Sequence, residues 1–425
     1  MGTDAVTGNR LSILLVSVGN VAGAAAQWYM IWLIARFAGP EAVGVYSLLI
    51  AVMSPIFITA QLGLRNLYIT LQAVVAWRVY ACLRLGGILV AGGLAVGALV
   101  TLAPEQAWTM GGAILVIKIA SSTADLYFAR IQRTERMRTF GVLLLLDAIC
   151  TVVVTAVVVL ITDSVITAVW ACAVVAVGTA VMTYVLASAA PPEGLIAERS
   201  FGQDVRLLVT HGVPLAMSQG IHALLAYLPI AIVGLLGTTS DIGVFSSAAY
   251  LVTFAHLVGA SVQTAILPDY RRRFEADGPT ALRRRIIGSG YVAMASLSPL
   301  IAVAVVAGPG LLRLVYGEEF EITRSAVLFF ALAAVICLPT SLLSSFHLVL
   351  NRYWVMTVVG AGSVLVVAVS GSVGGLAGMG AVEAGSMSVL ASVLCGYIGA
   401  HVLARRYQRR VPSPVSVRSA GGGSS

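Results

Sequence analysis

Residues 130–162 read RIQRTERMRTFGVLLLLDAICTVVVTAVVVLIT. Four arginines fall in the first nine positions, and an almost uninterrupted apolar run follows them from residue 140. A helix needs about 20 residues to cross the ~30 Å hydrocarbon layer of a bilayer, and this run is long enough. Loops rich in arginine stay on the cytoplasmic side of a membrane. The stretch therefore predicts a cytoplasmic loop followed by a transmembrane helix.

Apolar runs of this length recur along the whole chain. Hydrophobic residues make up 59% of the sequence and the mean hydropathy is +0.96, whereas globular domains are about 45–50% apolar. The predicted spans are 11–35, 43–64, 83–103, 107–129, 140–162, 165–188, 207–236, 242–267, 286–308, 322–348, 354–374 and 376–403. Twelve spans predict an all-α membrane protein with both termini on the same side.

The basic residues separate the loops into two alternating sets. Of the 26 lysines and arginines, one set of loops holds only Arg36, Arg313 and Arg324, and the other holds nearly all the rest. Cationic loops remain cytoplasmic, so both termini are predicted to face the cytoplasm across the cell membrane. The net charge of +8 then reflects topology, and no nucleic-acid partner is expected.

The amino end has two interpretations. The apolar stretch from Leu11 could belong to a cleaved signal peptide, but it continues through Trp28 to Ala35, longer than such a segment usually is. We therefore expect a retained first helix.

The five cysteines show no C-x-x-C spacing, so neither a metal site nor a disulfide framework is predicted.

A short repeat relates the two halves of the chain. Residues 34–39 lead into Val-Gly-Val-Tyr-Ser at 43–47, and residues 232–237 lead into Ile-Gly-Val-Phe-Ser at 242–246. The second copy lies six spans further on, so both copies cross the membrane in the same direction, as in transporters built from parallel repeats. The predicted organisation is a six-helix lobe at 1–188, a cytoplasmic linker at 189–206, a six-helix lobe at 207–404 and a disordered tail at 405–425.

Several short motifs also carry a family resemblance. They are the Gly-Pro turn before 43–47, QLGLR at 61–65, GVFSSAAY at 243–250, LPDY at 267–270 and VYGEEF at 315–320. With them the chain resembles the polysaccharide flippase branch of the multidrug/oligosaccharidyl-lipid/polysaccharide exporter superfamily.

This resemblance implies a fold and a function. The fold would be two six-helix lobes with the first, second, seventh and eighth helices lining a central cavity. The function would be to flip polyprenyl-pyrophosphate-linked oligosaccharide across the cytoplasmic membrane for surface polysaccharide biosynthesis, by alternating access. The alternative is a cation-coupled multidrug exporter of the same fold. Neither needs a cofactor. The one lysine, Lys118, precedes isoleucine and so forms no Walker motif, which argues against ATP hydrolysis through a P-loop. An enzyme is not expected, because the predicted outward loops are short and no Ser/His/Asp or metal-ligand spacing stands out.

The four helices implied to line the cavity each carry polar residues at helical spacing. Such residues either face a transport path or hold helix pairs together. The candidate substrate-binding residues are Asn20, Gln27, Gln61, Arg65, His211, Gln219, His222, Tyr250 and His256. Arg65 could form charge-assisted hydrogen bonds with a pyrophosphate.

Lys118 is the sharpest anomaly inside an apolar span. Asp125 lies seven residues further on the same helix face, and Asp147 enters the next span at a depth that a lysine can reach. The three residues could couple transport to a cation such as H⁺ or Na⁺, form a structural ion pair, or contact substrate. A lysine can lose its proton when buried, whereas arginine cannot.

The arginine clusters 271–273 and 283–285 lie in a predicted cytoplasmic loop. Clusters of this kind enforce topology and bind anionic membrane lipids. They could also recruit the diphosphate headgroup of a lipid-linked substrate.

Overall fold

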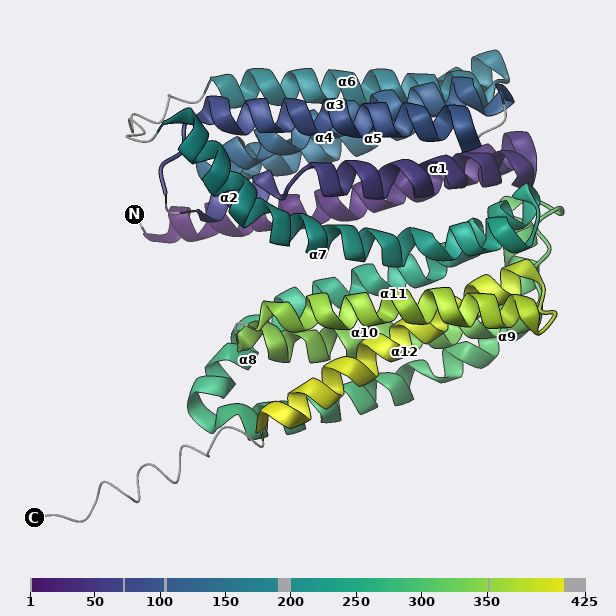
Figure 1. Ribbon diagram of the computed structural model, residues 1–425. Helices are drawn as coiled ribbons and strands as arrows, with labels where there is room; N and C mark the ends of the chain where they lie inside the picture. Colours follow the sequence, from purple (N-terminus) through teal and green to yellow (C-terminus); the bar gives the residue numbers. More distant parts are fainter. Residues whose placement is uncertain (1, 72, 103–104, 190–199, 351, 409–425) are drawn as a thin grey trace, which may run out of the picture. The chain divides into compact units, whose positions relative to one another are not determined.

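The computed structural model describes residues 2–71, 73–102, 105–189, 200–350 and 352–408. Every regular element in these ranges is a helix (Figure 1), which confirms the predicted all-α class. Most of the predicted linker, at 190–199, and the tail from residue 409 lie outside the described residues.

The chain divides into two units, Met1–Tyr227 and Leu228–Ser425. The elements of the first unit are α1 (Gly2–Ala60), α2 (Leu64–Thr70), α3 (Trp77–Leu102), the 3₁₀ turn η1 (Glu105–Ala107), α4 (Trp108–Arg133), α5 (Met137–Thr162), α6 (Val165–Ser188) and the first part of α7 (Phe201–Leu236). Small residues let these helices approach closely, as where Ala120 and Ala124 of α4 pack with Ala180 of α6.

The second unit contains the end of α7 and five further helices. These are α8 (Thr239–Leu297), α9 (Pro299–Tyr316), α10 (Arg324–Val349), α11 (Tyr353–Leu376) and α12 (Ala381–Gln408). Phe346 of α10 is fully buried, and it packs in one cluster with Leu282 of α8 and Ala404 of α12. The core of this unit therefore lies around α10.

The boundary between the units lies within α7, whereas the sequence analysis placed it in the linker 189–206. The physical reason is the packing of the first half of α7. Leu208 is buried in a cluster with Leu64 and Tyr68 of α2, so this half belongs with the first unit.

Two glycines form corners within the long helices α1 and α8. Gly39 (φ 73°, ψ −176°) lies inside α1, and Gly278 (φ 77°, ψ 178°) lies inside α8. This backbone region is essentially restricted to glycine, and in each case a proline follows that can begin the next helical arm. At the first corner α1 folds back along itself (Figure 1).

Eleven helices within the described ranges are long and apolar enough to cross a membrane. The first, Leu14–Thr70, contains the corner at Gly39 and therefore corresponds to two of the predicted spans. The chain is thus a multi-pass membrane protein, and the count of twelve crossings stays a prediction.

The repeated motifs have matching surroundings within their own units. Val43, Tyr46 and Ser47 are buried in the first unit, and the corresponding Ile242, Phe245 and Ser246 are buried in the second. Both motifs begin a helical arm directly after a corner or turn. This agreement supports the repeat predicted from the sequence.

Candidate functional site

A break after α1 creates the candidate site. The sequence predicted one helix over 43–64, but α1 ends at Ala60 and a left-handed turn follows, with Leu62 at φ 53° and Gly63 at φ 58°. A Cβ atom on Gly63 would lie 2.8 Å from Cβ of Leu215, so this turn needs glycine both for its conformation and for its contact with α7.

The short helix α2 then presents two different faces. Leu64, Leu67 and Tyr68 are buried against neighbouring helices. Arg65 and Ile69 lie one turn apart on the opposite side and line a pocket. Burial of the apolar face therefore fixes the direction in which Arg65 points.

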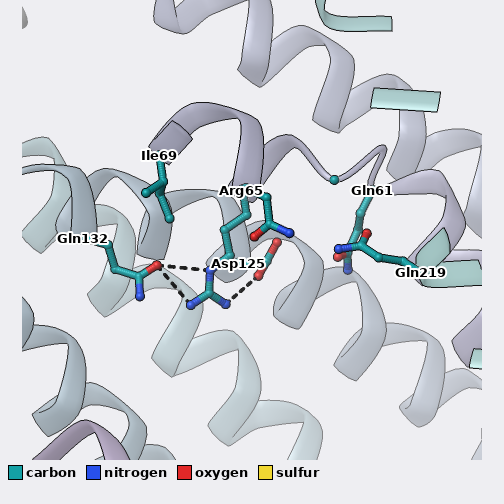
Figure 2. A pocket seen from close by; sticks show the side chains of 8 residues that line it. Gln61, Arg65, Ile69, Asp125, Gln132 and Gln219 are labelled. Carbon is teal, nitrogen blue, oxygen red and sulfur yellow. Dashed lines mark hydrogen bonds and ion pairs between the residues drawn. The ribbon is translucent and has the colours of Figure 1, made fainter. Parts of the chain in front are cut away.

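The pocket has a volume of about 330 Å³ and lies entirely within the first unit. It is lined by Gln61, Gly63, Arg65, Asn66, Ile69, Asp125, Gln132 and Gln219. Figure 2 shows the carboxamides of Gln61 and Gln219 close together on one side of the pocket, away from the guanidinium of Arg65. Four carboxamides, one guanidinium and one carboxylate thus surround the pocket.

Arg65 makes polar contacts at both ends of its guanidinium (Figure 2). Its Nε and Nη2 atoms donate to Oε1 of Gln132 at 3.2 and 3.1 Å. Its Nη1 atom donates to Oδ1 of Asp125 at 2.9 Å, and the ring of Phe140 lies 5.3 Å from its central carbon. The side chain is therefore held in place but remains 30% exposed.

Asp125 has a second arginine partner. Nη2 of Arg84 in α3 lies 3.0 Å from Oδ2 of Asp125, and Nη1 of Arg84 donates to the hydroxyl of Ser122 at 3.3 Å. The Arg84 side chain is only 4% exposed. Two guanidiniums and one carboxylate leave this group with a net positive charge, which favours an anionic ligand.

The sequence analysis did not single out Arg84, which it counted among the arginines of the cytoplasmic loops. It also missed Asn66 and Gln132, which line the pocket from α2 and α4. Arg84 falls just inside the predicted third span, and that position was the available signal. An arginine inside an apolar run needs a partner, and Asp125 is that partner.

The predicted substrate-binding residues of the first unit fall into two groups. Gln61, Arg65 and Gln219 come together in the pocket, although they come from distant parts of the chain. Asn20 and Gln27 lie exposed on the first arm of α1, outside the residues that line this pocket.

The predicted histidines of α7 bond to their own helix. Nδ1 of His211 lies 2.9 Å from the carbonyl oxygen of Leu207, and Nδ1 of His222 lies 2.8 Å from that of Ser218. Both side chains are exposed, so their Nε2 atoms remain available to a ligand.

The last two candidates, Tyr250 and His256, lie on α8 in the second unit. The ring of Tyr250 packs 6.2 Å from that of Phe254, and His256 is exposed. A shared cavity with the residues of the first unit stays a prediction.

The three predicted coupling residues, Lys118, Asp125 and Asp147, have separate surroundings in the structure, and their coupling role stays a prediction. Asp125 pairs with arginines of α2 and α3, and Asp147 accepts a hydrogen bond from Thr179 of α6 at 2.8 Å. Among the described residues, no hydrogen bond or ion pair reaches Lys118, which is only partly exposed. Arginine side chains on neighbouring helices reach Asp125 and pair with both of its oxygens.

The arginine cluster 271–273 is partly neutralised by neighbours on α8. Arg273 lies 2.7 Å and Arg272 3.9 Å from Asp269, and Arg271 lies 3.6 Å from Glu275. Arg271 and Arg272 are nevertheless highly exposed, so they can also contact anionic groups outside the protein.

Residues 33–324 match a family model described as polysaccharide biosynthesis protein. The match covers more than half of the chain. The chain belongs to this family. No curated protein matches the chain in sequence.

Solved structures of transporters share the fold of this family member. An inward-facing multidrug resistance MATE family transporter of the MOP superfamily matches with a TM-score of 0.66 at 13% identity, over 93% of this chain and 96% of that one. The lipid II flippase MurJ, in an inward closed conformation, matches with a TM-score of 0.66 at 12% identity, over 94% of this chain and 88% of that one. A variant of the Vibrio cholerae MATE transporter VcmN gives 0.61 at 13% identity, over 95% and 98%.

These findings confirm the resemblance stated from the sequence. The family match identifies a polysaccharide biosynthesis protein, and the fold is that of MOP superfamily transporters and flippases. These structural relatives are transporters and a flippase, in agreement with the non-enzymatic class predicted from the sequence.

Proposed function

We propose that this protein flips polyprenyl-pyrophosphate-linked oligosaccharides across the cytoplasmic membrane by alternating access, for surface polysaccharide biosynthesis. The observation that carries the proposal is the pocket beside Arg65, in a chain that belongs to the polysaccharide biosynthesis protein family. A guanidinium matches the geometry of phosphate oxygens, and carboxamides both donate to and accept from hydroxyls. A sugar joined to a diphosphate offers both kinds of partner.

The size of the pocket limits which part of the substrate it holds. Small-molecule pockets span about 300–1,000 Å³, and this pocket of about 330 Å³ lies near the lower limit. It suits the diphosphate and the adjoining sugar, with the rest of the oligosaccharide extending beyond it. The polyprenyl tail stays in the bilayer, so only the polar headgroup requires a hydrophilic path.

The second candidate is a cation-coupled multidrug exporter, because MATE transporters share the fold. The charge of the pocket argues against it. The carboxylate that lines the pocket, Asp125, is already neutralised by two guanidiniums. A lipophilic cation would therefore meet net positive charge, which is unfavourable.

Coupling to a cation gradient is proposed for Lys118 and Asp147. Lys118 lies in α4 without a partner among the described residues, and Asp147 lies in the neighbouring helix α5. A lysine in an apolar span is stable when neutral and gains from a carboxylate when charged. A change in packing between α4 and α5 could therefore alter its protonation and bind or release H⁺.

The remaining proposals concern the membrane. Both termini are cytoplasmic because the arginine-rich loops are, and anionic lipids contact exposed arginines such as Arg271 and Arg272.

A gene deletion tests the function. Loss of the protein should make lipid-linked oligosaccharide accumulate on the cytoplasmic leaflet and abolish surface polysaccharide, without a change in drug sensitivity. Complementation with Arg65→Lys should restore part of the polysaccharide, and Arg65→Ala much less, at equal membrane abundance. Normal surface polysaccharide together with sensitivity to cationic drugs would overturn the proposal in favour of the exporter.

A further inference from the structure

The two oxygens of Asp125 are held by different arginines in different surroundings. Oδ2 faces the buried Arg84, whereas Oδ1 faces Arg65, which is 30% exposed at the pocket. One carboxylate thus connects a buried charge to an accessible one.

These two ion pairs differ in how easily they can be exchanged. Removing Asp125 from Arg84 would leave a buried guanidinium without its counter-charge, which is strongly unfavourable. Moving Asp125 away from Arg65 leaves a partly exposed guanidinium that a ligand can reach. Partly exposed ion pairs contribute little to stability. The contact between Arg65 and Asp125 is therefore the exchangeable one.

We propose that Asp125 is a built-in competitor for the diphosphate of the substrate. Before substrate binds, its Oδ1 atom accepts the hydrogen bond that Nη1 of Arg65 donates. A diphosphate oxygen then takes this place, while Arg84 retains Asp125 through Oδ2. This inference rests on the proposed function and adds to it the regulation of affinity at the same site.

The competitor lowers the affinity in two ways. The diphosphate must displace an existing acceptor from Arg65, and it then lies near a carboxylate of the same charge sign, which repels it. A transport site has to release its cargo as well as bind it, and Asp125 would serve the release step. Removal of its charge should tighten binding and slow turnover.

The neighbouring Gln132 allows the opposite test. Its Oε1 atom accepts from Nε and Nη2 of Arg65, so Gln132→Glu adds a second competing carboxylate with little change in size. This substitution leaves the contact between Arg84 and Asp125 in place. It therefore tests the inference even where Asp125→Asn, which removes the counter-charge of Arg84, fails to fold.

The experiment is calorimetric titration of the purified full-length protein with inorganic pyrophosphate and with geranyl diphosphate. Asp125→Asn should lower Kd about tenfold and Gln132→Glu should raise it about tenfold, as expected for one unit charge a few ångströms from the ligand. The matched control is Asp163→Asn, the same chemical change at the exposed end of α5, where asparagine tolerates the left-handed conformation. Its Kd should equal that of the wild type.

The outcomes separate this inference from the proposed function. If wild type and Arg65→Ala bind diphosphate equally, or neither binds, the proposed site is wrong and the inference falls with it. If only Arg65→Ala loses binding, but folded Asp125→Asn is no tighter or Gln132→Glu is no weaker, the competitor role is wrong and the proposed function stands. Weaker binding by Asp125→Asn would likewise show that Asp125 has a purely structural role.

Discussion

Nη2 of Arg84 lies 3.0 Å from Oδ2 of Asp125, joining α3 to α4 inside the first unit. The pair neutralises the buried guanidinium of Arg84, whose unpaired charge would be costly in an apolar span. It also fixes the carboxylate beside the pocket, so the charge that a substrate meets depends on helix packing as well as on the residues that line the pocket.

The Arg84–Asp125 pair should show a stability coupling. Arg84→Gln and Asp125→Asn should each lower the thermal stability of the purified protein. Asp125→Asn leaves the buried Arg84 without its counter-charge, and Arg84→Gln leaves Asp125 with Arg65 as its remaining arginine partner. The double variant should lose less than the sum of both, with a coupling of about 0.5–3 kcal/mol. Additive losses would show that the pair contributes nothing specific.

Lys118 should affect transport more than stability. Lys118→Met should keep wild-type membrane abundance, because the lysine has no partner to lose among the described residues, and it should abolish cation-driven transport. Lys118→Arg, which stays charged, should also fail to transport. Transport by Lys118→Met at the wild-type rate would exclude a coupling role.

The corner at Gly278 should tolerate no side chain. Gly278→Ala should destabilise the protein by about 1–3 kcal/mol, because its φ of 77° with ψ of 178° is essentially restricted to glycine. Gly93→Ala is the matched control, since Gly93 lies in α3 and a Cβ atom there would meet open space. Alanine there should be neutral or stabilising, by up to about 1 kcal/mol. Thermal melting of both variants measures the difference, and equal melting temperatures would contradict the assignment.

Reporter fusions check the predicted topology. Fusions after Arg138 and after Arg285 should report the cytoplasm, and fusions near Asp163 and Glu319 should report the outer side, because arginine-rich loops are retained on the cytoplasmic side. A cytoplasmic signal at Glu319 would overturn the twelve-span topology.

The sequence predicts the spans well because hydropathy measures the same property that a bilayer requires. It predicts helix ends less well. The span predicted to end at 267 continues as α8 to the corner at Gly278. Arg273 with Asp269, and Arg271 with Glu275, are spaced four residues apart and stabilise a helix outside an apolar run.

The candidate site was predictable only in part. Helical periodicity groups Gln61 with Arg65, and both line the pocket, but the turn at Leu62 and Gly63 rather than one continuous helix face brings them there. Periodicity also places Lys118 and Asp125 on one helix face, but Asp125 pairs with Arg65 and Arg84, 60 and 41 residues earlier in the chain. Spacing within one helix cannot indicate which long side chain of a neighbouring helix reaches a carboxylate first.

The rate at which the reconstituted protein flips a lipid-linked oligosaccharide in proteoliposomes tests the proposed function most directly. Purified protein is reconstituted with a fluorescent polyprenyl-pyrophosphate oligosaccharide, and a membrane-impermeant quencher reports the leaflet in which the label lies. Wild-type protein should move the labelled lipid between leaflets at least tenfold faster than it moves in protein-free liposomes, and Arg65→Ala should reduce this rate about tenfold. A lipophilic cation should not be transported and should not slow the movement of the labelled lipid. Cation transport without movement of the lipid-linked oligosaccharide would contradict the flippase.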